Sequence, residues 1–481
     1  MAEAPGEQRW DREVDVVVLG YGAAGCAAAL EAHANGAEVL LLEKMPQGKE
    51  GGNTRVSGNV WFYNTGAEEA ATYLRSLCGA YPLPEDVVEA WASETRDLTR
   101  WVESLGGVVN SMDAPPEYPE LPGSGAHGGF RHVGPTWGNS HFWNFLTGKV
   151  AEAGIEVLLG TPGRELVQES SNAAVLGVVA QSQGGELRVR ARRGVVIATG
   201  GFENNPGMAR DYLGLPDVVP WGSPAGTGDG HRMAMRAGAD LWHMSNMFSH
   251  FGFRVPGHSS GFFMSLTEAR PCIFVGFDGA RFIDETTKSR HGHALVNGRY
   301  VVYPHSPFHV IFDERGRRAG PLSPRREVQP YGWNNVVEGY RWSDDNQAEI
   351  DKGWILKGDT PAELAATLGV PPESLEQTID EYNSFCELGR DARFDRSPET
   401  LVPLGEPPYY AVTWGPMLAN TNGGPRRNGR AEVLDVEGRP IPGLYAAGAV
   451  SSTYSMALDR GFSIADALAF GRVAGRNAAA R

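Results

Sequence analysis

Residues Val16–Gly25 of this 481-residue chain read VVVLGYGAAG, and they decide the fold. The apolar β-branched residues predict a buried parallel strand, and the pattern Gly-x-Gly-x-x-Gly follows it directly. A helical pattern then runs to Gly36, and a second apolar strand ends at Glu43. Such a strand–helix–strand unit is typical of a dinucleotide site, because the glycines let the backbone approach the pyrophosphate and the acid accepts from ribose hydroxyls. The residues of this unit that we expect to contact the cofactor are Gly20, Gly22, Ala23, Ala24, Gly25, Glu43 and Lys44.

The glycine motif by itself leaves two questions open. It does not distinguish FAD from NAD, and a tight turn without any ligand is the alternative explanation of the same residues. The strand before the glycines, the helix after them and the acid at the expected distance favour a nucleotide site.

Length and charge restrict the possible classes of protein. A chain of 481 residues predicts two domains, or one large domain with an insertion. The net charge of −15 argues against a nucleic-acid-binding surface and against attraction to an anionic membrane. The segment before Asp15 has no signal-peptide pattern and no apolar run reaches the length of a membrane span, so we expect a cytoplasmic protein without membrane insertion.

The cysteines do not form a recognisable metal-binding or haem-attachment pattern. There are four, at scattered positions: Cys26, Cys78, Cys272 and Cys386. We expect reduced and mostly buried thiols, and no metal site.

A second glycine-rich segment, Gly51–Gly58, follows the acid and reads GGNTRVSG. Its short hydroxyl and amide side chains predict a loop that lies flat on a polar ligand, and a surface turn is the alternative. From Gly20 to Gly58 the chain resembles the FAD-binding segment of the succinate dehydrogenase/fumarate reductase flavoprotein superfamily, which includes 3-ketosteroid dehydrogenases, urocanate reductases and L-aspartate oxidases. In this segment the resemblance implies FAD contacts from Gly51, Gly52, Asn53, Thr54, Ser57 and Gly58.

The resemblance also bears on how FAD is held. In the membrane-complex members of the superfamily, a histidine near this loop carries FAD covalently. No histidine lies between Glu43 and Gly58, which implies non-covalent FAD.

Later segments resemble other FAD-contacting parts of the superfamily. They are Gly194–Phe202, Gly226–Gly230, Ile441–Gly448 and Gly461–Asp466. The last one predicts a helix that begins near Ser463, whose positive end stabilises negative charge on the reduced flavin. The cofactor-binding residues that these segments add are Thr199, Gly200, Gly201, Asp229, Gly448, Ser463 and Ile464.

Between the matching segments, residues 256–404 show no regular strand–helix alternation. We therefore expect an α/β fold: a Rossmann-like FAD-binding domain of the GR2 type with an inserted α+β cap or substrate domain. The first part of the FAD-binding domain is placed at residues 1–255, the cap at 256–404 and the second part at 405–481.

A long loop rich in Pro, Gly and aromatic residues is expected at residues 113–139. Within it, Pro115–Glu120 resembles a ketosteroid-dehydrogenase segment whose tyrosine faces the substrate, and Tyr118 stands at the tyrosine position. Packing of Tyr118 inside the loop is the alternative.

Two further candidates come from the fumarate-reductase pattern. His250 stands where a His-Pro-Thr histidine binds a substrate carboxylate, although Phe251 and Gly252 follow it; a structural histidine is the alternative. Arg290 lies one residue beyond the usual place of a proton-donating arginine, and an ion pair with Asp284 or Glu285 would also explain it.

The C-terminal candidates match less well. Arg460 is displaced by two positions from a substrate-binding arginine, and an ion pair with Asp459 is the alternative. Tyr454 lies near the place of a catalytic tyrosine of ketosteroid dehydrogenases. Asn420 stands where fumarate reductases have a second substrate-binding histidine.

The resemblance implies an FAD-dependent dehydrogenase or reductase that acts on CH–CH bonds. We expect it to introduce or reduce a C=C bond conjugated to a carbonyl of a ketosteroid-like or other cyclic ketone. A base removes the proton α to the carbonyl while the β-hydrogen leaves as hydride. The alternatives are an enzyme of fumarate reductase or tricarballylate dehydrogenase type, which acts on a carboxylate, and, less favoured, a non-catalytic flavoprotein. The expected partners are a small-molecule substrate and an unknown electron acceptor other than NAD(P), because only one dinucleotide motif is present.

Overall fold

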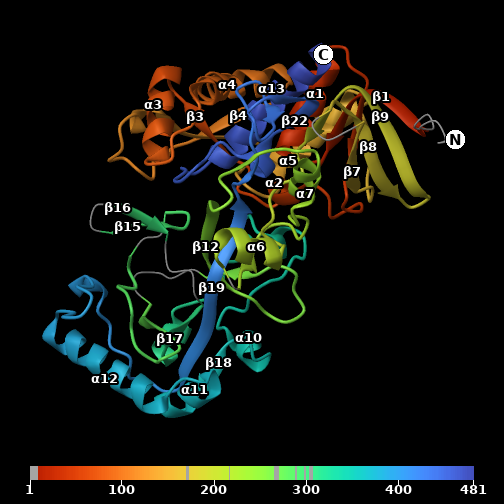
Figure 1. The fold of residues 1–481 in the computed structure, drawn as a ribbon. Helices are drawn as coiled ribbons and strands as arrows, with labels where there is room; N and C mark the ends of the chain where they lie inside the picture. Colours follow the sequence, from red (N-terminus) through yellow and green to blue (C-terminus); the bar gives the residue numbers. More distant parts are fainter. Residues whose placement is uncertain are drawn as a thin grey trace. The chain divides into compact units, whose positions relative to one another are not determined.

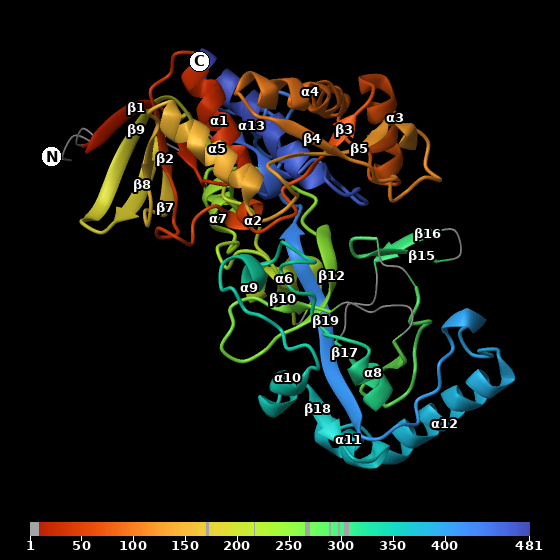
Figure 2. The same ribbon diagram turned by 180° about the vertical axis from the view of Figure 1, so that it is seen from behind.

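The computed structural model describes residues 9–169, 173–215, 217–264, 270–287, 290–296, 299–302 and 307–481 (Figures 1 and 2). The chain divides into two compact units. Unit 1 comprises residues 1–213, 222–248 and 419–481, and unit 2 comprises residues 214–221 and 249–418. The boundaries expected from the sequence lie at 255/256 and 404/405, whereas strands β12 (Met247–Phe253) and β19 (Tyr409–Thr421) carry the chain across the boundaries of the units.

A mostly parallel sheet forms the centre of unit 1. Its strands follow the order β21-β22-β9-β1-β2-β6, with β8 and β7 attached beyond β9. The residues of the central strand β1 from Val16 onward are buried and pair in parallel with β2 and β9, as the apolar run predicts. The strands are β1 (Arg12–Leu19), β2 (Val39–Leu42), β6 (Glu156–Leu158), β7 (Gly163–Gln168), β8 (Val175–Ser182), β9 (Gly185–Ile197), β21 (Glu432–Leu434) and β22 (Pro440–Ala446). This arrangement confirms the expected α/β fold with a Rossmann-like centre.

Two helices from opposite ends of the chain, α1 (Ala23–Ala34) and α13 (Phe462–Ala480), pack side by side in unit 1 (Figure 2). Glycines make this close approach possible. A Cβ atom on Gly471 would lie 2.5 Å from the carbonyl oxygen of Ala24, and one on Gly475 would lie 2.3 Å from that of Ala28. Helix α1 is therefore held in place by a helix more than 400 residues away in sequence.

The expected loop over residues 113–139 is partly wrong. It contains strand β5 (His127–Val133), which pairs antiparallel with β3 (Trp61–Asn64) on one side and β4 (Val109–Met112) on the other. Glycines and histidines disfavour a strand by propensity, but two partners supply its hydrogen bonds. The expected loop at 51–58 likewise contains a short helix, α2 (Gly52–Arg55).

The remaining elements of unit 1 surround these two sheets. They are α3 (Ala67–Cys78), α4 (Glu85–Ser104), η1 (Ser124–Ala126), α5 (His141–Glu152), α6 (Pro206–Leu213), α7 (Asp229–Arg236), β11 (Leu241–Trp242), β20 (Gly424–Pro425) and η3 (Gly448–Ser451).

Unit 2 is built on a second, mainly antiparallel sheet in the order β13-β12-β19-β17-β14. Alternate residues of β17 (Phe308–Phe312) face two different cores. Phe308, Val310 and Phe312 belong to an aromatic core, whereas Ile311 belongs to an aliphatic core that includes side chains of α11 (Pro361–Leu368) and α12 (Pro372–Leu388). The other elements are β10 (Val219–Pro220), β13 (Phe262–Phe263), β14 (Cys272–Val275), β15 (His293–Val296), β16 (Arg299–Val302), α8 (Glu314–Arg318), α9 (Trp333–Val336), α10 (Gln347–Asp351), β18 (Leu356–Gly358) and η2 (Pro398–Thr400).

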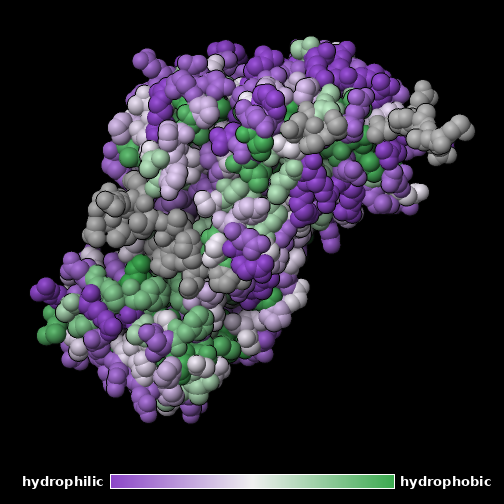
Figure 3. Space-filling model, in the orientation of Figure 1, coloured by the Kyte–Doolittle hydropathy of each residue, from purple (hydrophilic) through white to green (hydrophobic). Residues whose placement is uncertain are grey.

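Large apolar side chains are exposed on both units. In the view of Figure 3, unit 2 shows more hydrophobic surface than unit 1. Among the described residues, the exposed large apolar side chains are Tyr81, Val108, Met235 and Val436 in unit 1 and Phe277, Phe282, Val328 and Leu388 in unit 2. Over the described ranges, no helix combines the length and the apolar character that a membrane span requires.

Candidate functional site

The glycine turn between β1 and α1 is closely packed in unit 1. Gly20 has a φ of +106°, and a Cβ atom there would lie 2.4 Å from the carbonyl oxygen of Ala198, just after β9. A Cβ atom on Gly25 would lie 1.9 Å from the carbonyl oxygen of Gly20. Gly22 is the residue before α1, and the N–H of Ala23 donates to Thr54 Oγ1 at 2.9 Å. The turn therefore needs glycine at positions 20 and 25, as in sites where a dinucleotide approaches a helix N-terminus.

Glu43 is buried at the end of β2. Its Oε2 accepts from the N–H of Tyr21 at 2.9 Å, and its Oε1 accepts from the N–H of Met45 at 2.7 Å. Burial raises the pKa of Glu43, although these two hydrogen bonds oppose the shift. Each carboxylate oxygen keeps a second lone pair, so Glu43 can also accept from the hydroxyls of a ribose.

Lys44 and Asp229 come together at the edge of the same site. The Lys44 ammonium donates to Asp229 Oδ2 and to Thr227 Oγ1, both at 2.7 Å. Burial alone would raise the pKa of Asp229, but the hydrogen bond and the charge of Lys44 lower it below its usual value. These contacts join the end of β2 to the start of α7.

Asn53 joins the second glycine-rich segment to the rest of unit 1. Its Nδ2 donates to Glu203 Oε1 and to the carbonyl oxygen of Ala419, both at 2.7 Å, and its Oδ1 accepts from the N–H of Ser223 at 2.8 Å. Ser57 Oγ donates to the carbonyl oxygen of Thr54 at 2.9 Å. The predicted FAD-contacting segment is thus bonded to three residues that the sequence did not indicate, Glu203, Ser223 and Ala419.

The two glycines before Asn53 both have a positive φ, a backbone conformation that favours glycine. Gly51 has a φ of +101°, and a Cβ atom there would lie 2.5 Å from the Trp143 ring. Gly52 also has a positive φ, of +55°. The carbonyl oxygen of Gly58 accepts from the N–H of Gly138 at 2.7 Å.

Several buried polar atoms around this place have no hydrogen-bond partner among the described residues. They are Thr199 Oγ1, Glu203 Oε2, His231 Nδ1 and Asn422 Nδ2. Buried polar atoms in proteins are normally paired, so this group is suited to the polar atoms of a ligand.

Two more predicted glycines border the same region. Gly200 has a φ of +73° and Gly448 a φ of +77°. A Cβ atom on Gly448 would lie 2.9 Å from Cβ of Ala24, which brings the end of β22 against the start of α1. The donors, acceptors and glycine backbone of unit 1 therefore fit FAD.

The start of α13 differs from the expectation. The helix begins at Phe462 after Gly461, so Ser463 and Ile464 lie in its first turn and Ser463 is not the cap. Gly461 has a φ of +78°, and a Cβ atom there would lie 2.8 Å from the N atom of Phe62. A left-handed glycine allows the chain to enter the helix at this point.

Tyr454 lies beneath this helix start and is fully buried. Its hydroxyl donates to the carbonyl oxygen of Phe462 at 2.7 Å and accepts from Trp91 Nε1 at 3.2 Å. Burial raises the pKa of this hydroxyl well above its usual value. Because the Tyr454 hydroxyl donates to one protein group and accepts from another, these contacts favour a packing role over proton transfer for Tyr454.

Sequence reasoning missed a buried polar cluster around Asp459. The carboxylate accepts from the Tyr73 hydroxyl at 2.6 Å and from the backbone N–H groups of Glu117 and Arg460 at 2.9 and 2.6 Å. His127 Nε2 lies 3.9 Å from Asp459 Oδ1. Tyr73 precedes Asp459 by 386 residues in the sequence, and His127 precedes it by 332 residues. No local sequence pattern connects residues at such distances.

The candidates Tyr118 and Arg460 both border this cluster. Tyr118 follows Glu117 and is fully buried. The Arg460 side chain lies 3.2 Å from Glu117 Oε1, so its ion pair is with Glu117, and only its backbone N–H uses Asp459. The structure therefore brings Tyr118 and Arg460 near each other along the chain segment that carries Glu117.

In unit 2, His250 on β12 lies among aromatic rings. The ring centroids of Trp221, Phe263 and His291 lie 5.2, 5.6 and 5.4 Å from that of His250. Trp221 also contacts Tyr331, at 5.2 Å between centroids. Burial, with a smaller effect of His291, lowers the pKa of His250 to about 3, so its imidazole is neutral at physiological pH.

Arg290 and Asn420 differ in what surrounds them. The backbone of Arg290 exchanges hydrogen bonds with that of His293, at 2.7 and 3.1 Å. Glu285, one proposed partner of Arg290, accepts from Arg281 at 2.8 Å and from Arg396 at 3.0 Å. Asn420 Nδ2 donates to Asn422 Oδ1 at 2.8 Å.

The five catalytic candidates belong to different units. Tyr118, Tyr454 and Arg460 lie in unit 1, and His250 and Arg290 lie in unit 2. Their catalytic roles stay predictions.

We expect Glu43→Ala to weaken FAD binding by about ten- to a hundredfold, because hydrogen bonds to a charged group contribute about 1.5–3 kcal/mol. Titration of the apoprotein with FAD, followed by flavin fluorescence, measures the change. Glu38→Ala is the matched control, since Glu38 precedes the same strand at its opposite, exposed end. Wild-type affinity in Glu43→Ala would contradict the ribose-binding role.

Comparison with known proteins agrees with this geometry. The profile of a family described as FAD binding domain matches residues 15–462. A vinyl phenol reductase of Lactiplantibacillus plantarum is 30% identical over 97% of this chain and 96% of its own length. A urocanate reductase of Eggerthella lenta is 29% identical over 97% of this chain and 75% of its own length.

Solved structures extend the similarity to the whole fold. The 3-ketosteroid delta1-dehydrogenase from Sterolibacterium denitrificans, in complex with 1,4-androstadiene-3,17-dione, superposes with a TM-score of 0.78 at 25% identity, over 98% of this chain and 100% of that chain. The open conformation of a flavocytochrome c3 fumarate reductase superposes with a TM-score of 0.72 at 26% identity, over 98% of this chain and 79% of that chain.

Proposed function

Because the chain belongs to the FAD binding domain family, within the succinate dehydrogenase/fumarate reductase flavoprotein superfamily, and is an FAD-dependent oxidoreductase acting on CH–CH groups, we propose that its substrate is a cyclic ketone. The enzyme introduces or reduces a C=C bond conjugated to the ketone carbonyl. The aromatic surroundings of neutral His250 are the observation that carries this proposal.

The neutral imidazole of His250 favours a ketone over a carboxylate as the substrate. A neutral imidazole can donate one N–H to a carbonyl oxygen, which polarises the carbonyl without a counter-charge. A substrate carboxylate would need a cationic partner, and a charge held poorly paired in dry surroundings costs about 2–5 kcal/mol of binding. The rings of Trp221 and Phe263, stacked with centroids 5.6 Å apart, add apolar surface suited to a ring.

The names of similar proteins include both kinds of substrate. Vinyl phenol and a 3-ketosteroid contain rings, whereas fumarate is an acyclic dicarboxylate. The arrangement around His250 supports the ring-containing class for this chain.

FAD, when bound, accepts the hydride from the carbon β to the carbonyl or returns it there. We propose that it is held non-covalently, by Glu43, Asn53 and the glycine turns of unit 1. Tyr118 is the candidate that moves the α-proton, because the Tyr454 hydroxyl is bonded to Phe462 and Trp91. An unperturbed tyrosine has a pKa near ~10, so proton removal by Tyr118 needs a cation in its vicinity.

Anaerobic bleaching of the flavin tests the substrate class. The panel contains a 3-ketosteroid, a cyclohexanone, a 4-oxocyclohexane carboxylate, succinate and tricarballylate, with 4-vinylphenol and fumarate tested as electron acceptors against dithionite-reduced enzyme. We expect exchange of electrons with the cyclic ketones. Exchange with the acyclic carboxylates alone would refute the proposal.

Tyr118→Phe is expected to lower the rate of flavin bleaching by about a hundredfold, the usual effect of losing a positioned acid or base. Tyr81→Phe is the control, because the Tyr81 side chain is 62% exposed. An unchanged rate in Tyr118→Phe would leave Tyr118 with a packing role only.

A further inference from the structure

Glu203 is a buried carboxyl group that the proposed reaction does not use. It follows Thr199–Gly201 at the end of β9 and is 1% exposed. Glycine backbone surrounds its oxygens: a Cβ atom on Gly201 would lie 2.4 Å from Oε2, and one on Gly226 would lie 2.3 Å from Oε1. Space for this carboxyl group therefore depends on two glycines from separate segments.

The neighbours of Glu203 are mostly neutral. Oε1 accepts from Asn53 Nδ2 at 2.7 Å, and Oε2 has no hydrogen-bond partner among the described residues. Thr421 Oγ1 lies close to the same niche and accepts from the N–H of Phe202 at 2.9 Å.

Few titratable or charged groups act on the carboxyl. Lys44, from the segment after β2, lowers the pKa of Glu203, and its own ammonium is paired with Asp229 of α7 at 2.7 Å. His231 of α7 packs against Phe202, and burial lowers the pKa of His231 to about 4, so it is neutral at physiological pH.

Two protonation states of Glu203 are therefore accessible. Burial raises the pKa of this carboxyl to about 7, against the opposing hydrogen bonds of backbone N–H groups and Asn53 and the charge of Lys44. In both states Oε1 can accept from Asn53, and the unpartnered Oε2 is where a proton can bind.

We propose that Glu203 is a positioning residue that holds Asn53 in the FAD site and takes up a proton at Oε2 when the FAD is reduced. Asn53 belongs to the segment predicted to contact FAD, and a Cβ atom on Gly201, another predicted FAD contact, would lie 2.4 Å from Glu203 Oε2. The carboxyl therefore lies one hydrogen bond away from a predicted FAD contact.

Compensation of the negative charge gained by the flavin explains the proton uptake. The substrate is oxidised and transfers a hydride, two electrons and one proton, to the flavin, which thereby gains one negative charge. In the same step one proton from solvent binds the Glu203 carboxylate and forms the neutral acid. The total charge of the buried site stays constant, which avoids the cost of two like charges in surroundings of low dielectric constant.

The test is the number of protons taken up per two electrons, obtained from the pH dependence of the flavin midpoint potential by spectroelectrochemistry of the holoenzyme. In the wild type we expect an uptake of two protons per two electrons over a pH range that begins near neutral pH. In Glu203→Gln, which imitates the neutral acid and keeps an acceptor for Asn53, we expect one proton over that range. The reduction equilibria of the two proteins then diverge by a further factor of ten for each pH unit.

Glu165→Gln is the control, because Glu165 is an exposed carboxylate on β7 of the same unit, and it should follow the wild type. Equal proton counts in wild type and Glu203→Gln would overturn the proposal, as would a FAD affinity more than tenfold lower in a folded Glu203→Gln protein. If Glu203→Gln does not fold, the wild type still decides: one proton per two electrons from pH 5 to 9 would overturn the proposal.

Discussion

Gly25→Ala is expected to yield a protein that retains less than a tenth of the wild-type FAD. The added Cβ atom would lie 1.9 Å from the carbonyl oxygen of Gly20, and neither backbone segment can move without opening the turn. The turn supplies the helix N-terminus to the pyrophosphate, so its distortion removes a main contact of the cofactor. Flavin absorbance per polypeptide after desalting measures retention, and the thermal midpoint reports the accompanying loss of stability.

Gly148→Ala is the matched control for this substitution. Gly148 lies inside α5, a Cβ atom there meets no atom within 4 Å, and its φ is not positive. Alanine is favoured over glycine in a helix by about 1 kcal/mol, so Gly148→Ala should retain FAD and unfold at the same or a higher temperature. Full FAD content in Gly25→Ala would show that the turn does not bind the pyrophosphate.

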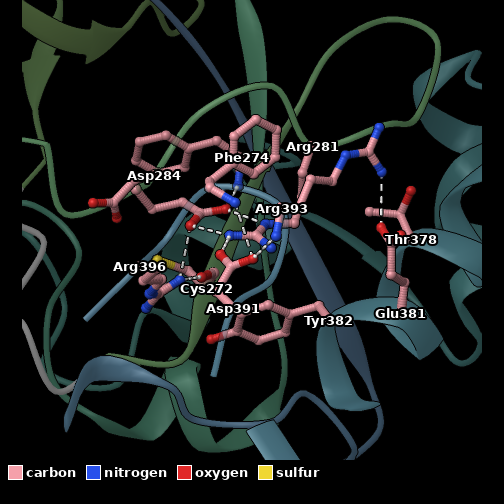
Figure 4. A network of polar contacts seen from close by, with 12 residues as sticks. Cys272, Phe274, Arg281, Asp284, Thr378, Glu381, Tyr382, Asp391, Arg393 and Arg396 are labelled. Atoms are coloured by element: carbon pink, nitrogen blue, oxygen red, sulfur yellow. Dashed lines mark hydrogen bonds and ion pairs between the residues drawn. The ribbon is translucent and has the colours of Figure 1, made fainter. Parts of the chain in front are cut away.

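Glu285→Gln is expected to destabilise unit 2 by about 3–5 kcal/mol. This residue joins a buried network whose members Arg281, Asp391 and Arg396 are labelled in Figure 4. Arg281 donates to Glu285 and to Asp391, all at 2.8 Å, and Arg396 donates to Glu285 at 3.0 Å. Burial alone would lower the pKa of Arg281, but Glu285 and Asp391 raise it above its usual value. Removing one carboxylate leaves buried guanidinium charge without compensation, which has the stated cost.

Chemical denaturation, followed by the fluorescence of the tryptophans of unit 2, measures this loss. Glu381→Gln is the matched control. Glu381 pairs with Arg393 at 2.8 Å, and their side chains are 41% and 42% exposed, respectively. Exposed pairs of this kind contribute about 0–1 kcal/mol. A loss below 1 kcal/mol in Glu285→Gln would contradict a structural role for the network.

Local chemistry explains which parts of the fold could be predicted. The strand, glycine turn, helix and acid of the FAD site are contiguous from Val16 to Glu43, and their spacing alone indicates the fold. Strand β5 was missed because its hydrogen bonds come from β3 and β4, while its own glycines and histidines favour a loop.

The polar contacts of the candidate site could not be predicted either, because they join residues far apart in the sequence. Asn53 and Glu203 are 150 residues apart, and Tyr73 and Asp459 are 386 residues apart. No sequence period connects such residues, because the tertiary fold alone brings them together. The residue type of Ser463 predicts a helix cap, whereas the left-handed Gly461 before Phe462 sets the actual start of the helix.

The packing of α1 against α13 has a consequence for biosynthesis. The glycine turn emerges from the ribosome more than 400 residues before the helix that covers α1. At about 5–20 residues per second, the nascent chain spends tens of seconds with α1 uncovered. Unit 2, whose residues end at 418, is complete before then. A chain that ends before Phe462 lacks the helix that packs on α1, so we expect such a chain not to retain FAD.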